Sequence, residues 1–129
     1  MPVAADIEVL IVDDQRTMRG LVHSSLRELG FTRFRECMDG DDALQSLSIK
    51  PAHLIISDMN MPNMDGLALL KAVRSNPATK GTAFIMLTSR GDAELVKRAV
   101  ALGVNNYVMK PFTLTTLKKK LEAVFGQLT

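Results

Sequence analysis

The strongest constraint on the fold is a series of five short apolar runs, separated by stretches with helical periodicity. The apolar runs are Val9 to Val12, Phe34 to Met38, Leu54 to Ser57, Phe84 to Leu87, and Tyr107 to Met109. Runs of this length predict strands. The first and third are apolar at consecutive positions, which is typical of parallel strands that helices cover on both faces.

The segments between the runs favour helices. Apolar residues recur at helical spacing in two of them: Met18, Leu21, Val22, Leu26 and Leu29, and then Leu114, Leu117, Leu121, Phe125 and Leu128. Gly30 and Gly103 stand where helices would end, and Asp92 and Thr113 where helices would begin. Strand and helix thus alternate five times, which predicts an α/β fold, a doubly wound (βα)5 domain with a parallel five-stranded sheet.

Length and composition favour one domain in a reducing compartment. A chain of 129 residues can bury one core, so we expect a single domain over residues 1–129 with no output domain. It starts without a leader pattern, has a single cysteine and contains no run long enough to span a bilayer. We therefore expect a cytoplasmic protein, without membrane insertion. The net charge of only +2 gives no reason to expect nucleic acid as a partner, and we expect a monomer.

Polar residues close or follow four of the five apolar runs. Asp13 and Asp14 follow the first run and Asp58 the third, whereas Thr88 follows the fourth and Lys110 the fifth. The carboxyl ends of parallel strands form one edge of a doubly wound sheet, and ligands bind there. These five side chains are therefore expected to converge.

A cluster of three carboxylates is predicted to bind a cation. Two carboxylates ~4 Å apart repel each other by roughly 4 kcal/mol at an effective dielectric constant near 20. Carboxylate oxygens suit Mg2+ or Mn2+, whereas Zn2+ prefers Cys and His. His23 and His53 are expected to be ordinary helix or loop residues, away from this edge of the sheet.

Asp58 has the expected surroundings of a nucleophilic carboxylate. A cation and Lys110 would neutralise the charge of an incoming phosphoryl group, and the Thr88 hydroxyl would donate to one of its oxygens. Such positioning and charge compensation are most of what phosphoryl transfer requires. Each residue alone has an ordinary structural explanation, so the prediction depends on their combination.

These residues resemble the receiver domains of bacterial two-component response regulators, over nearly the whole chain. The most specific segment, Asp58-Met59-Asn60-Met61-Pro62-Asn63-Met64-Asp65-Gly66, is similar to the phosphoacceptor loop of that family. Other signature positions are matched by Val12-Asp13-Asp14, Thr88-Ser89 and Lys110-Pro111-Phe112. With no output domain expected, the chain resembles the stand-alone chemotaxis type.

The resemblance implies the strand order 2-1-3-4-5, which is inherited from the family. It also implies that Asp58 is the phosphoacceptor. Asp13 and Asp14 would hold Mg2+ together with Asp58, and Asn60 would add its backbone carbonyl. Lys110 would pair with the phosphoryl group, and a cis bond to the following proline would turn it towards the site.

The resemblance further implies a switch. Thr88 would supply the switch hydroxyl and Tyr107 the switch aromatic ring, and phosphorylation would change the surface of the fourth helix, fifth strand and fifth helix. Candidate contacts on that surface are Lys97, Arg98 and Lys118. A sensor histidine kinase would be the phosphodonor, and the downstream partner would be a target protein such as a flagellar motor switch.

The chain departs from the family at Arg90, where chemotaxis-type receivers often have an acidic residue. That position borders the path of the hydrolytic water, so Arg90 and Asn60 are expected to tune the lifetime of the phosphorylated state.

Three alternatives remain open. A haloacid dehalogenase-type aspartyl-phosphate phosphatase has an acid two residues after its nucleophile, whereas Asn60 stands there in this chain, so we expect no efficient enzyme. A flavodoxin-like FMN carrier would have a hydroxyl-rich phosphate loop in place of Asp13-Asp14. A receiver that binds partners without phosphorylation is the third. No glycine-rich nucleotide loop occurs, so ATP is not the expected phosphodonor.

Overall fold

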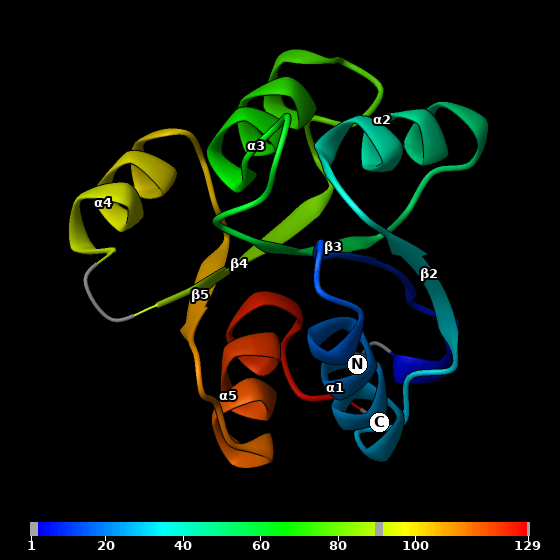
Figure 1. The fold of residues 1–129 in the computed structure, drawn as a ribbon. Coiled ribbons are helices and arrows are strands. Elements are labelled where there is room, and N and C mark those ends of the chain that lie inside the picture. Colours follow the sequence, from blue (N-terminus) through cyan, green and yellow to red (C-terminus); the bar gives the residue numbers. More distant parts are fainter. Residues whose placement is uncertain (1–2, 90–91, 129) are drawn as a thin grey trace.

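Five parallel strands form the centre of the fold, with helices on both faces of their sheet (Figure 1). The computed structural model describes residues 3–89 and 92–128. The strands are β1 (Glu8–Val12), β2 (Arg33–Cys37), β3 (Leu54–Asp58), β4 (Ala83–Thr88) and β5 (Asn106–Met109). A 3-10 helix η1 (Ala4–Asp6) precedes α1 (Arg16–Glu28), α2 (Gly40–Ile49), α3 (Gly66–Ser75), α4 (Ala93–Ala101) and α5 (Leu114–Phe125).

The strand order is β2-β1-β3-β4-β5. This confirms both the predicted doubly wound fold and the order that the family resemblance implied. The direction of strand succession reverses at β1 and β3, which lie side by side in the sheet. In open sheets of this kind, the ligand crevice lies at the carboxyl ends of the strands beside the reversal.

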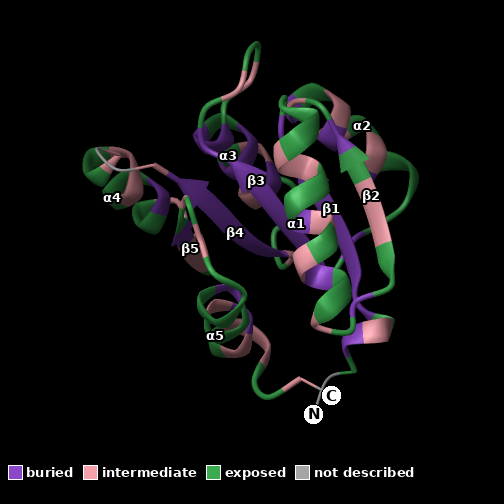
Figure 2. Ribbon diagram, turned by 60° about the horizontal axis from the view of Figure 1, so that its bottom comes forward, coloured by how far each residue is buried: buried purple, intermediate pink, exposed green. Residues whose placement is uncertain are grey.

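The apolar runs become strands because both faces of the sheet are covered. In β1, β3 and β4 every residue is buried (Figure 2). Alternate strand residues pack against α1 and α5 on one face and against α2, α3 and α4 on the other (Figure 1). Val9, Ile11 and Ile56 lie in the first cluster, whereas Leu10 and Ile55 lie in the second. Burial on both faces accounts for the apolar residues at consecutive positions.

The strand boundaries differ from the sequence prediction by one residue at several ends. Met38 lies beyond β2, and the residue is 61% exposed. Its backbone N–H donates to the Asp42 carboxylate at 3.1 Å, so the chain has already turned away from the sheet. Asp58 and Thr88, by contrast, are the last residues of β3 and β4 and are buried. Backbone pairing with the neighbouring strand extends β3 and β4 past the apolar run.

The structure confirms all four predicted helix ends. Gly30 and Gly103 follow α1 and α4 with φ of 99° and 92°, a conformation that glycine adopts without strain. The Thr113 hydroxyl caps α5 by accepting from the Thr116 N–H at 3.1 Å. Asp92 occupies the predicted N-cap position of α4, but its side chain does not cap the helix, because its carboxylate accepts from the Ser89 N–H at 2.8 Å.

The two histidines lie in ordinary structural positions. His53 precedes β3, at the opposite end from Asp58, and its Nδ1 accepts from the Glu8 N–H at 2.8 Å. The His23 ring lies on α1, with its centroid 4.2 Å from that of Phe34. Among the described helices, none is long and apolar enough to cross a membrane.

Candidate functional site

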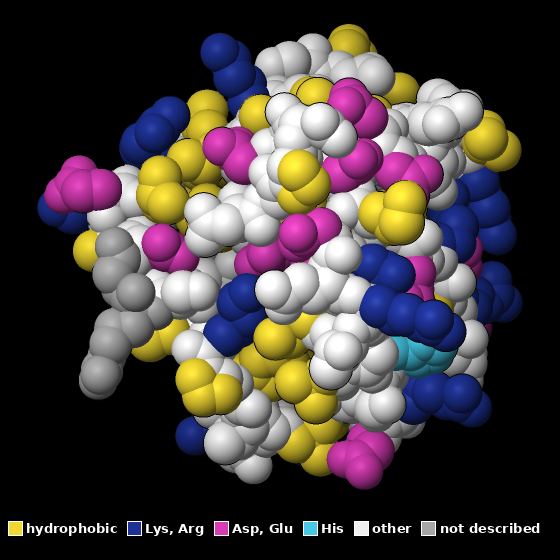
Figure 3. Space-filling view, viewed as in Figure 1, with side chains coloured by type: hydrophobic (Ala, Val, Ile, Leu, Met, Phe, Trp, Pro, Cys, Tyr) yellow, Lys and Arg dark blue, Asp and Glu magenta, His cyan; other side chains and the backbone are white. Residues whose placement is uncertain are grey.

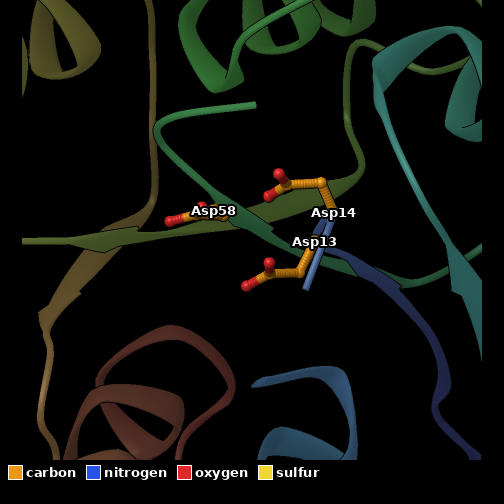
Figure 4. Close-up of side chains that lie close together, drawn as sticks. All are labelled: Asp13, Asp14 and Asp58. Carbon is orange, nitrogen blue, oxygen red and sulfur yellow. The ribbon is translucent and has the colours of Figure 1, made fainter. Parts of the chain in front are cut away.

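Three carboxylates meet at the carboxyl edge of the sheet (Figure 4). Asp13 and Asp14 directly follow β1, and Asp58 ends β3, the neighbouring strand. One oxygen of each carboxylate lies within 4.8 Å of the others. Asp13 and Asp58 are buried, whereas Asp14 is exposed. Acidic side chains also gather near the middle of this face in Figure 3.

Only one of the two carboxylate oxygens of the buried Asp13 has a hydrogen-bond partner in the described structure. Its Oδ1 accepts from the Gln15 N–H at 2.8 Å, but Oδ2 is buried without a hydrogen-bond partner in the described structure. Burial raises the pKa of Asp13 above its usual range, and the nearby charges of Asp58 and Asp14 also raise that pKa. The Gln15 N–H and Lys110 act in the opposite direction but do not cancel the effect of burial.

The cluster fits a hard divalent cation. An orphaned buried oxygen on Asp13 and two further carboxylates supply only oxygen ligands, and Asp14 keeps one side open for water. This is the donor set that Mg2+ uses. The sequence prediction that Asp13, Asp14 and Asp58 converge is confirmed by the geometry, while their role as metal ligands stays a prediction.

Lys110 directly follows β5 and reaches across the edge of the sheet to Asp58. Its Nζ donates to Asp58 Oδ1 at 2.8 Å, and the two side chains are only 17% and 7% exposed. The Lys110–Pro111 peptide bond is cis, as the resemblance implied. The structure therefore brings the predicted lysine onto the predicted phosphoacceptor.

The Thr88 hydroxyl is buried and only weakly engaged. It donates to the Val108 carbonyl at 3.5 Å, at the long limit of a hydrogen bond. Thr88 also lines a cavity of about 310 Å³ between β4, α4 and β5, and the half-buried Tyr107 lines the same cavity. Lys120 Nζ lies over the Tyr107 ring, 4.7 Å from the ring centroid. The two predicted switch residues thus face one space.

Two further predicted residues have less support. Asn60 lies two residues after Asp58 in an exposed loop, and its carbonyl role stays a prediction. Arg90, predicted to tune the lifetime, lies outside the described residues. Lys97, Arg98 and Lys118 are all exposed, as a surface role requires.

Gly66 packs against the end of β3 beside Asp58. The sequence indicated it only as the last residue of the motif that begins at Asp58. A Cβ at this position would lie 2.5 Å from the Asp58 carbonyl oxygen and 3.0 Å from the Met59 Cα. The Gly66 N–H donates to the Met59 carbonyl at 2.9 Å, which folds the loop after Asp58 back onto the strand end. A side chain at position 66 would therefore push the backbone of Asp58 out of place.

Gly66→Ala is expected to lower the free energy of unfolding by about 1–3 kcal/mol, the usual cost of overpacking a tight site. The matched control is Gly20→Ala within α1, where a Cβ would meet nothing within 4 Å. Helix propensity predicts that this control is stabilised by roughly 0.5–1 kcal/mol. Urea denaturation measures both, and equal midpoints for the two variants would contradict the proposed close approach.

Arg19 on α1 was not singled out from the sequence. It contacts the backbone of the acidic pair, and its partner Glu36 lies 17 positions along the chain, on β2. No local pattern signals this pairing.

Comparisons with known proteins agree on one family. The family model for the response regulator receiver domain matches residues 9–122. The chain is 51% identical over 128 residues to the "Probable chemotaxis protein CheY" of Rhizobium etli, covering 99% of each chain. It is 41% identical to the chemotaxis protein CheY-3 of Vibrio cholerae, covering 95% of each. The solved structure of the chemotaxis response regulator CheY4 of Vibrio cholerae superimposes with a TM-score of 0.83 at 36% identity, covering 92% of this chain and 98% of that one.

Proposed function

Because the chain belongs to the response regulator receiver-domain family, we propose that phosphoryl transfer to Asp58 switches its signalling state. The observation that carries the proposal is the buried contact of 2.8 Å between Lys110 and Asp58, inside a three-carboxylate cluster. Proteins of this type are signalling proteins rather than conventional enzymes. The site residues, the metal and the partners below are the finer part of the proposal.

Asp58 is the nucleophile. One of its carboxylate oxygens bonds to phosphorus as the bond from phosphorus to the donor breaks, and the donor is a phosphohistidine of a sensor histidine kinase. Lys110 compensates the negative charge of the incoming phosphoryl group. Because its Nζ already contacts Asp58, the lysine needs to move little during the transfer. Asp13, Asp14, Asp58 and the Asn60 carbonyl would hold Mg2+, which supplies the remaining positive charge at the phosphoryl oxygens.

Thr88 couples this event to the surface. Its hydroxyl gives up a long hydrogen bond of 3.5 Å to Val108 and turns to the new phosphoryl oxygens. This movement opens the shared cavity of about 310 Å³ to the Tyr107 ring. The ring then changes the surface of α4, β5 and α5, where a partner reads the switch.

The relatives suggest the pathway. Two of them are named as chemotaxis proteins and match nearly the full length of this chain, so chemotaxis is the proposed context. The proposed output partner is a flagellar motor switch protein. Residues 1–129 would act as one cytoplasmic receiver domain, a monomer.

The alternatives have less support. A phosphatase of the haloacid dehalogenase type needs an acid two residues after its nucleophile, and Asn60 stands there. A flavodoxin-like phosphate loop is incompatible with three carboxylates at the strand ends. A receiver that works without phosphorylation would not require Lys110 to lie on Asp58.

Incubation with Mg2+ and acetyl phosphate is expected to add the mass of one phosphoryl group. Peptide mapping after borohydride reduction of the acyl phosphate should locate the group at Asp58. The control reaction contains a chelator in place of Mg2+ and should remain unmodified. Recovery of the group mainly on another residue would contradict the proposed site.

Activation is expected to raise partner affinity about tenfold, within the usual range of coupling between sites. Titration of a flagellar motor switch protein with and without beryllofluoride measures this change. Asp58→Asn is the control, because beryllofluoride should leave its affinity unchanged. Equal affinities in both states, with Asp58 occupied, would remove this partner from the switch.

A further inference from the structure

Arg19 connects the acidic pair to the edge strand of the sheet. Its Nη1 donates to the Asp13 carbonyl at 2.7 Å, and its Nε lies 3.2 Å from Oε1 of Glu36 on β2. The Arg19 side chain is only 12% exposed. The guanidinium is therefore held between α1, β2 and the end of β1.

The Asp13 carbonyl belongs to the peptide group that joins Asp13 to Asp14. The Asp13 N–H already donates to the Cys37 carbonyl at 3.1 Å, and its Oδ1 accepts from the Gln15 N–H. The Arg19 contact fixes the plane of the following peptide. That plane sets the direction in which the exposed Asp14 side chain leaves the backbone.

An arginine suits this position better than a lysine. Its planar guanidinium presents several donors in a fixed arrangement, so one side chain can hold a carbonyl and a carboxylate together. Glu36 also lies 3.2 Å from His23 Nδ1, which anchors its second oxygen. The Asp13 carbonyl and the Glu36 carboxylate together restrict how the Arg19 side chain can move.

We propose that Arg19, braced by Glu36, is a positioning residue for Mg2+ binding by Asp13 and Asp14. The inference rests on the proposed function. It extends that function to a residue that is not itself a proposed ligand of the metal or the phosphoryl group. It predicts that loss of Arg19 weakens Mg2+ binding, whereas loss of its positive charge alone would strengthen it. Since a guanidinium repels a nearby cation, removing its charge without any positioning role would tighten Mg2+ binding.

Arg19→Ala is expected to weaken Mg2+ binding about tenfold, as loss of an outer partner of metal ligands usually does. Isothermal titration with Mg2+ alone, at a temperature where each variant is folded, measures the change. Arg27→Ala is the matched control, because Arg27 is an exposed arginine on the same helix. It removes the same charge and should leave the affinity within about twofold of wild type.

Two more variants separate positioning from a general effect on the fold. Arg19→Lys keeps the charge but cannot hold both partners, and Glu36→Gln keeps Arg19 but removes the ion pair. Both should weaken Mg2+ binding by a few fold. In acetyl phosphate reactions, Arg19→Ala should raise the Mg2+ concentration needed for half-maximal rate, while the rate at saturating Mg2+ stays near that of wild type.

Unchanged or tighter Mg2+ binding by Arg19→Ala, with wild type binding normally, would overturn the role of Arg19 and leave the proposed function intact. An equal loss in Arg19→Ala and Arg27→Ala would also overturn that role. Failure of wild type to bind Mg2+ would overturn the metal site itself, and this proposal with it.

Discussion

Asp58→Asn is expected to abolish phosphorylation while leaving the protein folded. The amide occupies nearly the same volume as the carboxylate but is a far poorer nucleophile. Asp58 is only 5% exposed, so a substitution that keeps its shape is the appropriate test. The measurement is incorporation of phosphoryl groups from acetyl phosphate, followed by intact-mass analysis.

The fold should survive because opposing charge effects partly cancel. The substitution removes the attraction between Lys110 and residue 58, but it also relieves repulsion from Asp13 and Asp14. Without Mg2+, the free energy of unfolding is expected to stay within about 1 kcal/mol of the wild-type value.

Asp41→Asn provides the control for this experiment, because Asp41 is an exposed acid in the first turn of α2. It should be phosphorylated like wild type. Full phosphorylation of folded Asp58→Asn would show that another residue is the acceptor. The contact between Lys110 and Asp58 would then need a different explanation.

The fold was predictable because its signals are local. The apolar run from Val9 to Val12 indicates a strand, and Gly30 indicates the end of a helix. Neither prediction requires knowledge of the tertiary structure. The differences arise where a side-chain hydrogen bond within a few residues overrides the general pattern. Met38 leaves β2 because the Asp42 carboxylate accepts from its N–H. Asp92 stands at the predicted N-cap of α4, but its carboxylate accepts from the Ser89 N–H and not from an N–H of the helix.

The site was predictable to the extent that strand ends determine it. Asp13, Asp58 and Lys110 each close or follow a strand, so all three lie at one edge of the sheet, and the long Lys110 side chain reaches past β4 to Asp58. Arg19 was not predictable in this way. It lies on a helix, and only the pairing of β1 with β2 brings Glu36 close enough to hold it.

Mg2+ is expected to raise the melting temperature of the wild-type protein on the order of 10 °C at a hundredfold excess over its dissociation constant. A ligand bound only by the native state adds about 2.7 kcal/mol at that excess. Dividing this gain in unfolding free energy by the unfolding entropy of a chain of this length gives the expected shift in melting temperature. Metal binding is expected to be favourable here because it would relieve repulsion among three carboxylates, one of which has a buried oxygen without a hydrogen-bond partner in the described structure.

Asp14→Ala should abolish this Mg2+-dependent shift, whereas Asp41→Ala should retain it. Acidification should also reduce the shift. Because the pKa of Asp13 is raised, its proton stabilises the metal-free fold below the ordinary carboxyl pKa, and that contribution is lost as pH rises through the raised pKa. Mg2+ needs the deprotonated form, so its stabilisation appears over the same window as pH rises. Thermal melts with and without Mg2+ across that window measure both effects, and a melting temperature indifferent to Mg2+ at neutral pH would rule out the acidic metal site.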